Sequence, residues 1–310
     1  MIIKKERIPV PVRESDYVCV YTPQADVYNG VKTKSFVPGK RYDKWIPNDF
    51  SVMKRDGEWH MVGITHPAPN GFIDGFDREQ DCEIHEGEFQ LFHCKAKGEL
   101  FSEVFRENSF EECEKMLYPQ SRPGEANEIW APHIMEHGGK IKIIYSPKAM
   151  RLAESVDFKH WKTGEILFTG ESDVARDPYI FRENGVFYIL YVEGNRIDYR
   201  TSADLKRWSE AKVLQVNPFL GAASESPFLM RRGEYLYLFW CIWDGRNGAY
   251  DNRTFVFAAK TLEELSNTAP IAMLDAHAPE IICDENGECF ILSVFYPHGG
   301  ISAARLRFEE

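Results

Sequence analysis

One hairpin pattern recurs along the chain at nearly constant spacing, and it limits the folds that this sequence can adopt. Each copy begins with a small or acidic residue and a proline, followed by an apolar strand, a glycine-containing turn and a second apolar strand. The copies begin at Ala131, Asp177, Ser226 and Ala278. Their prolines, Pro132, Pro178, Pro227 and Pro279, are 46, 49 and 52 residues apart. A fifth copy begins at Asp49, with Phe50 in the position of the proline.

A second repeat has the same period. The segment SVDFKHW ends at Trp161 and SADLKRW ends at Trp208, 47 residues later, each after the hairpin of its own unit. Five units of about four strands predict an all-β fold, a five-bladed β-propeller formed by residues 1–310 as a single domain. A β-sandwich with coincidental hairpins is the alternative, and it does not explain the constant spacing.

The first unit is longer than the others, because 82 residues separate Phe50 from Pro132. We therefore expect a long loop excursion at about 67–128, over one face of the propeller. The early strand at 16–21 has no blade of its own. It can pair with the last strand, at 300–308, and so close the ring.

Composition excludes some classes of partner. The formal net charge of −11 argues against nucleic acid, and no apolar run is long enough for a membrane span. The N-terminal segment MIIKKERIPVPV lacks the apolar core of a signal peptide. Seven scattered cysteines without metal-ligand spacing favour reduced thiols, and hence a cytoplasmic protein.

Acidic residues stand at blade starts, which converge on one end of a propeller channel. Asp49, Asp177 and Glu225 belong to different units, so the fold would gather three carboxylates in one pocket. Burying carboxylates together is unfavourable unless a reaction needs them. Glycoside hydrolysis does, because one carboxylic acid protonates the leaving oxygen and one carboxylate acts as base or nucleophile.

The segments that contain these residues resemble those of glycoside hydrolase families 43 and 32, which are five-bladed propellers. NDF at 48–50, RDP at 176–178 and SESPF at 224–228 match the catalytic motifs in order and blade, and IWAPHI at 129–134 resembles the second-blade opening of family 43. The resemblance covers roughly 45–308. Two departures are Ser226, where family 43 usually has glycine, and Phe50, where family 32 usually has proline.

The resemblance implies that Glu225 is the general acid, that Asp49 is the general base of an inverting enzyme, and that Asp177 tunes the pKa and contacts the sugar. The alternatives from the residues alone are an Asx turn at Asp49, a surface pair of Asp177 with Arg176, and a solvated loop at Glu225. Adjacent strand residues point to opposite sides, which makes the pair with Arg176 the weaker explanation.

Further residues are candidates for substrate binding, and each has packing as its alternative role. They are Trp130, His133, Arg176, His277, His66 and Trp240. Trp45, Trp130 and Trp240 are the aromatic rings on which a sugar could stack. No cofactor is required by this chemistry; the resemblance places a channel ion such as calcium near His277.

The expected function is release of a sugar from a small glycoside or oligosaccharide of the arabinose, xylose or galactose type, with inversion. A retaining fructosidase or transglycosidase like family 32, with Asp49 as nucleophile, is the alternative among enzymes. A non-catalytic carbohydrate-binding propeller is the alternative from another class. All three have a carbohydrate as partner.

Overall fold

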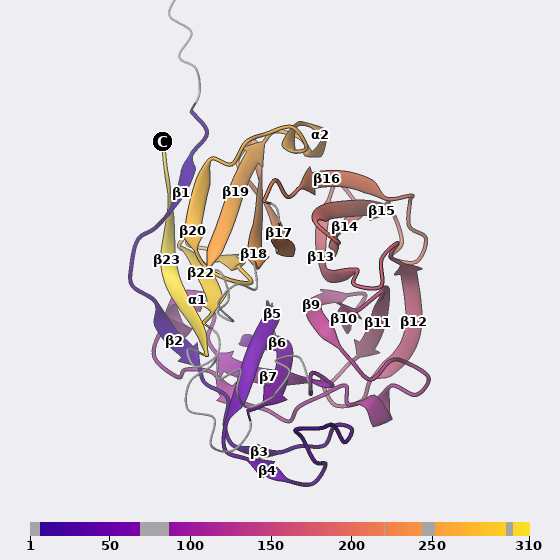
Figure 1. Ribbon diagram of the computed structural model, residues 1–310. Helices are drawn as coiled ribbons and strands as arrows, with labels where there is room; N and C mark the ends of the chain where they lie inside the picture. Colours follow the sequence, from indigo (N-terminus) through magenta and orange to yellow (C-terminus); the bar gives the residue numbers. More distant parts are fainter. Residues whose placement is uncertain (1–6, 69–86, 220, 244–251, 296–299) are drawn as a thin grey trace, which may run out of the picture.

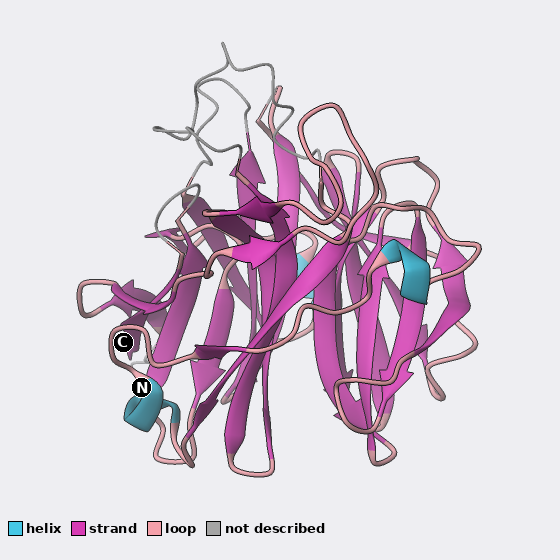
Figure 2. Cartoon of the chain, turned by 90° about the horizontal axis from the view of Figure 1, so that it is seen from below, coloured by secondary structure: helices cyan, strands magenta, loops and turns pink. Residues whose placement is uncertain are grey.

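The computed structural model describes residues 7–68, 87–219, 221–243, 252–295 and 300–310. The regular secondary structure of the described residues is almost entirely β-strand (Figure 2). Five sheets are arranged in chain order around a common centre (Figure 1), which confirms the predicted five-bladed propeller. The helices α1 (Phe101–Val104) and α2 (Leu262–Leu265) are only four residues long. No helix in the described residues is long and apolar enough to cross a bilayer.

Each of the first four blades is an antiparallel sheet whose strands follow one another in sequence. Blade 1 consists of β5 (Trp45–Arg55), β6 (Glu58–Pro67), β7 (Gln90–Lys97) and β8 (Glu111–Glu112). Blade 2 consists of β9 (Trp130–His137), β10 (Lys140–Ser146), β11 (Ala149–Ser155) and β12 (Lys162–Thr169). Blade 3 consists of β13 (Arg176–Glu183), β14 (Val186–Glu193), β15 (Arg196–Ser202) and β16 (Lys212–Val216). Blade 4 consists of β17 (Ala223–Arg232), β18 (Tyr235–Trp243), β19 (Arg253–Ala259) and β20 (Ala272–Asp275).

The fifth blade joins the two ends of the chain. It contains β21 (Glu280–Cys283), β22 (Cys289–Val294) and β23 (Ile301–Glu309). Both β1 (Val10–Arg13) and β2 (Val18–Tyr21) pair antiparallel with β23. The predicted pairing of the early strand with the last one is confirmed, and it closes the ring.

The long first unit supplies more than a loop. Strands β7 and β8 lie within 67–128 and complete blade 1, and a short 3₁₀ helix, Pro119–Ser121, follows them. The part of the expected excursion at 69–86 lies outside the described residues. Before blade 1, β3 (Asp26–Val27) and β4 (Arg41–Tyr42) form a separate two-stranded sheet.

The inner strands share a kink just before the repeated proline. Ala131, Asp177, Ser226 and Ala278 all have positive φ, between 37° and 57°. This conformation is uncommon for residues other than glycine and costs of order 1–3 kcal/mol. The strand pairing shifts register at three of these kinks, for example between Arg176 and Tyr179. Side chains beside a kink therefore do not alternate as in a regular strand.

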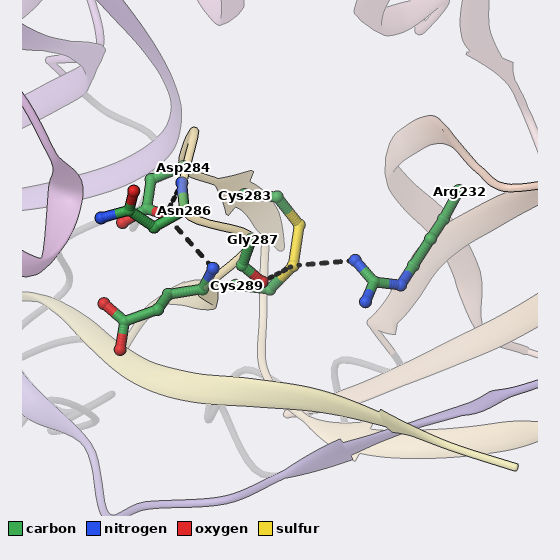
Figure 3. The surroundings of a disulfide bond; sticks show 7 residues. Arg232, Cys283, Asp284, Asn286, Gly287 and Cys289 are labelled. Atoms are coloured by element: carbon green, nitrogen blue, oxygen red, sulfur yellow. Dashed lines mark hydrogen bonds between the residues drawn. A yellow bond between two sulfur atoms is a disulfide. The ribbon is translucent and has the colours of Figure 1, made fainter.

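One pair of cysteines differs from the expectation of reduced thiols. Cys283 and Cys289 face each other across the hairpin that joins β21 to β22, and they form a disulfide (Figure 3). Arg232 of blade 4 points at the Cys289 sulfur, 3.4 Å away. The expectation is therefore wrong for this pair, and the cysteines no longer support a cytoplasmic location.

Candidate active site

Three carboxylates from three blades lie together where the inner strands begin. Asp49 belongs to β5, Asp177 to β13 and Glu225 to β17. Asp177 is 4% exposed and Glu225 is 9% exposed, whereas Asp49 is partly exposed. Because β5, β13 and β17 lie nearest the centre of the ring (Figure 1), the group stands at one end of the channel. This is the convergence that the repeat predicts.

Ser226 links two of these carboxylates. Its hydroxyl donates to Asp49 Oδ1 over 2.7 Å, and its backbone N–H donates to Asp177 Oδ2 over 2.9 Å. The positive φ of 49° at Ser226 accompanies this double orientation. The residue that departs from the family 43 pattern therefore positions both aspartates.

Arg176 contacts the third carboxylate, Glu225, and also Asp177. Its Nη2 lies 3.3 Å from Glu225 Oε1, and its Nε lies 3.5 Å from Asp177 Oδ2. The expectation that Arg176 and Asp177 point apart is wrong, because the kink at Asp177, with φ of 57°, breaks the alternation of the strand. The contact is largely shielded from solvent rather than a surface pair, with side-chain exposures of 15% for Arg176 and 3% for Asp177. Arg176 thus partly balances the negative charge of the site.

Two of the carboxyl groups hold their protons unusually tightly. Burial, followed by the negative charge of Glu225, raises the pKa of Asp49 to about 7, although the Ser226 hydroxyl opposes the shift. Burial also raises the pKa of Asp177 to about 7, against the influence of Arg176. Both groups can therefore exchange protons near neutral pH.

His277 and Cys241 complete the surroundings of Glu225. His277 Nε2 lies 3.5 Å from Glu225 Oε2, and the Cys241 thiol contacts the Glu225 carbonyl at 3.6 Å. One donor atom from each of the three residues lies within 4.8 Å of the others. Calcium prefers oxygen ligands, and only Glu225 offers one here. A nitrogen and sulfur set suits zinc better, yet Arg176 already places a cation on this carboxylate. The residues therefore do not fit the calcium ion expected near His277.

A small cavity of about 30 Å³ continues into the channel beneath the carboxylates. His133 lines it and lies 3.3 Å from the Ser51 hydroxyl through Nδ1. Burial lowers the pKa of His133 to about 3, which keeps its ring neutral. Glu280 lines the same cavity, and burial raises its pKa well above the usual range. The channel at the site is therefore narrow, and burial disfavours charge on both His133 and Glu280.

The candidate aromatic residues differ in their surroundings. Trp130 is partly exposed at the start of β9, and its indole N–H has no acceptor among the described residues. Trp240 is 1% exposed and stacks on Phe257 at 5.8 Å within the core of blade 4. The assignment of Trp240 to substrate binding is therefore wrong. Trp45 is 4% exposed and packs in another core cluster, so it is not a sugar platform either.

His66 is also buried, at 3% exposed, with Nδ1 2.9 Å from the Pro67 carbonyl oxygen. It does not line the channel cavity among the described residues. The structure therefore does not bring His66 to the three carboxylates, and its assignment to substrate binding is not supported.

Sequence reasoning missed Ser226, Cys241 and Glu280 as members of this region. Aligning the repeats on their prolines would have found two of them. The residue before each proline is Ala131, Asp177, Ser226 or Ala278, so Ser226, and not Glu225, is the counterpart of Asp177. The residue after Pro279 is Glu280, the counterpart of His133. Cys241 comes from the second strand of its blade, where no motif marks it.

Comparisons with known proteins agree with this architecture. No protein-family model and no curated protein matches the sequence. Among solved structures, the native Bacillus subtilis arabinanase Arb43A matches with a TM-score of 0.59 at 15% identity, over 85% of this chain and 94% of that one. A GH43_1 enzyme of Xanthomonas citri complexed with xylose matches with a TM-score of 0.59 at 10% identity, over 85% and 86%.

The Bombyx mori GH32 β-fructofuranosidase BmSUC1 matches with a TM-score of 0.57 at 16% identity, over 84% of this chain and 58% of that one. At such low identity the likeness concerns the fold. The chain thus shares its five-bladed propeller with glycoside hydrolases of both families that its motifs resemble.

Proposed function

We propose that the protein is a glycoside hydrolase that releases a sugar from a small glycoside or oligosaccharide by inversion at the anomeric carbon. The observation that supports this most is the group of Asp49, Asp177 and Glu225, delivered by three blades to one end of the channel. Their Coulombic influence on one another and the two raised pKa values are typical of catalytic carboxylates. The matching folds of family 43 and family 32 enzymes add support.

Glu225 is the general acid in this proposal. It donates a proton to the glycosidic oxygen as the bond to the leaving group breaks. Arg176 contacts Oε1 of Glu225, and Oε2 faces His277. As Glu225 becomes charged, the guanidinium of Arg176 stabilises the new carboxylate.

Asp49 is the general base. It takes a proton from the water molecule that attacks the anomeric carbon on the opposite face of the sugar. Burial raises the pKa of Asp49 and with it the basicity of the carboxylate; the further rise caused by charge on Glu225 is absent while Glu225 carries the proton of the acid. The Ser226 hydroxyl fixes the position of Oδ1. Asp177 keeps Oδ1 without a donor among the described residues, so this atom can accept a hydrogen bond from a sugar hydroxyl.

The proposed substrates are arabinose-, xylose- or galactose-type glycosides. A panel of aryl glycosides and plant oligosaccharides tests this with wild type and Glu225→Gln. Turnover of at least one pentoside or galactoside by wild type, and its loss in the variant, is the expected result. Absence of turnover on the whole panel would favour the non-catalytic carbohydrate-binding propeller.

A retaining enzyme is the second candidate, because the RDP tripeptide at 176–178 is typical of family 32 and a fructofuranosidase shares the fold. Asp49 would then attack the anomeric carbon itself. Proton NMR of the first-formed sugar distinguishes the two, because inversion and retention give opposite anomers. A product of retained configuration would make Asp49 a nucleophile rather than a base.

A further inference from the structure

A second and much larger cavity, of about 530 Å³, lies on the flank of the propeller between blades 1 and 2. It is separate from the carboxylates, and no residue lines both cavities. His60, on its wall, pairs with Met53, which is four residues further along β5 than Asp49. That spacing is about 13 Å along the strand. The volume is within the usual range for small-molecule sites, about 300–1,000 Å³.

Between blades 2 and 3, apolar side chains fill the place that corresponds to this cavity. Counting from the hairpin turns, the position of His93 in blade 1 is that of Leu152 in blade 2. Phe158, in SVDFKHW, is likewise the counterpart of Leu205 in SADLKRW. Leu152 and Leu205 belong to one buried apolar cluster between blades 2 and 3. Between blades 1 and 2, the same place contains imidazole and phenyl rings beside a hollow.

The imidazole pair is not explained by stability. His60 and His93 are 5% and 6% exposed, and His60 Nδ1 lies 3.0 Å from His93 Nε2. Phe158 stacks over both rings, at 4.2 Å and 4.7 Å. Burial lowers the pKa of His60 to about 4 and that of His93 to about 3, so both rings are neutral. Aliphatic side chains at these positions would avoid the desolvation of four ring nitrogens.

The lining of the cavity indicates the chemistry of a ligand. Its basic and acidic side chains are equal in number: Arg55, Lys95, Lys115 and Lys159 against Asp56, Glu58, Glu114 and Asp157. Several are already paired, as Lys95 is with Glu58 at 2.9 Å. Aromatic rings from Tyr118, Phe158 and Trp161 complete the wall. Balanced donors and acceptors beside aromatic faces suit a neutral molecule with many hydroxyl groups, and do not suit an ion.

We propose that this cavity is an accessory carbohydrate-binding site, which holds part of a neutral oligosaccharide away from the carboxylates. The choice of an oligosaccharide related to the substrate rests on the proposed function. Binding itself requires no turnover. Trp161 and Phe158 contribute ring faces. The charged side chains of the wall accept hydrogen bonds from sugar hydroxyls and donate hydrogen bonds to them.

Affinity electrophoresis of the full-length chain through gels containing arabinan or xylan tests the proposal. Trp161→Ala is compared with Trp208→Ala, the counterpart in the next blade, which does not line the cavity. Wild type and Trp208→Ala are expected to be retarded equally. Loss of a stacking ring in Trp161→Ala should weaken retardation about fivefold. Equal retardation of Trp161→Ala and wild type, or equal loss in both variants, would overturn the proposal.

The double variant His60→Leu with His93→Leu separates binding from folding. It places at position 93 the leucine found at the counterpart position, Leu152, and it leaves neither imidazole unpaired. We expect retardation to fall while the melting temperature rises by about 2 °C or more. Unchanged retardation in a folded double variant would also overturn the site. If wild type cleaves no glycoside but Trp161→Ala loses retardation, the proposed function fails and the accessory site stands.

Discussion

Ser226 donates its hydroxyl hydrogen to Asp49 Oδ1 over 2.7 Å from a left-handed backbone conformation. The two residues are 177 positions apart in sequence and belong to inner strands of different blades. Such a bond stabilises the charged form of Asp49 and so limits the rise of its pKa. The side chain at position 226 therefore sets the pH at which the proposed base becomes active.

Replacing Ser226 with alanine should move the acidic limb of the pH–rate profile to higher pH. Without the hydroxyl the pKa of Asp49 rises, because a hydrogen bond to the charged form is lost; a shift of about one pH unit is expected. The measurement is kcat/KM between pH 4 and 9 on one substrate.

Ser226→Gly is the matched control for that experiment. It also lacks the hydroxyl, so it should show the same pH shift. Glycine accepts positive φ without strain, so this variant should be more stable than Ser226→Ala by about 1 kcal/mol. An acidic limb that stays in place in both variants would show that the hydroxyl does not tune Asp49.

Glu225→Gln should abolish turnover of glycosides with poor leaving groups and reduce turnover of activated aryl glycosides much less. Glutamine keeps the shape of the side chain but cannot donate the proton, and an activated leaving group needs little protonation. The measurement is kcat/KM against leaving-group pKa for both proteins.

Glu280→Gln is the control for the acid. Glu280 is a second buried carboxyl of the channel, and burial raises its pKa, so glutamine keeps the shape of the side chain without a charge. The dependence of kcat/KM on the leaving-group pKa should be the same in Glu280→Gln as in wild type. An equal loss on both classes of substrate in Glu225→Gln would argue against Glu225 as the acid.

Asp177→Asn should lower activity and shift the pH profile to lower pH. The Coulombic interaction of Asp177 and Asp49 disfavours charge on either group, so removing one charge lowers the pKa of the other. Asparagine can still accept the hydrogen bond from the Ser226 backbone, which preserves the local geometry. A profile with unchanged limbs at a near-normal rate would remove Asp177 from the site.

The fold could be predicted because a few residues at nearly constant spacing mark its repeat. The spacing of Pro132, Pro178, Pro227 and Pro279 defines the blades, and a strand without a blade, at 16–21, indicates how the ring closes. Residues 69–86, within the expected excursion at 67–128, lie outside the described residues.

The site could be predicted in outline but not in its contacts. Sequence shows that Asp49, Asp177 and Glu225 stand near blade starts, but it does not show a left-handed residue before each proline. That kink turns Arg176 toward Asp177 and brings Ser226 between the aspartates.

Two further predictions, the role of Trp240 and the reduced state of the cysteines, were wrong for different reasons. In the sequence of a strand, a buried tryptophan such as Trp240 cannot be distinguished from one on which a sugar stacks. Only the packing of the neighbouring elements decides which face of the strand is covered. The cysteine pair was recoverable, since Cys283 and Cys289 flank one predicted hairpin turn and are direct partners in its register. A count of seven scattered cysteines concealed that local relationship.

The raised pKa of Asp49 also makes stability depend on pH. An unfolded aspartate loses its proton near pH 3.8, whereas the folded one keeps it up to about pH 7. The folded state therefore binds the proton more tightly, and its stability falls as pH rises from about 4 to about 7. Above pH 7 the full cost of burying the charge is present.

Asp49→Asn should consequently be more stable than wild type at pH 8 and nearly equal to it at pH 4. The expected gain at pH 8 is about 1–3 kcal/mol, since asparagine carries no charge and can still accept the bond from Ser226. Urea unfolding at both pH values measures it, with Asp43→Asn, at an exposed position, as the control that should change little. Because a base needs its charge, activity should be lost in the variant that gains stability. A less stable Asp49→Asn at pH 8 would mean that the charged carboxylate is favoured by its surroundings, and that Asp49 is a structural ion-pair partner rather than a base held at the edge of ionisation.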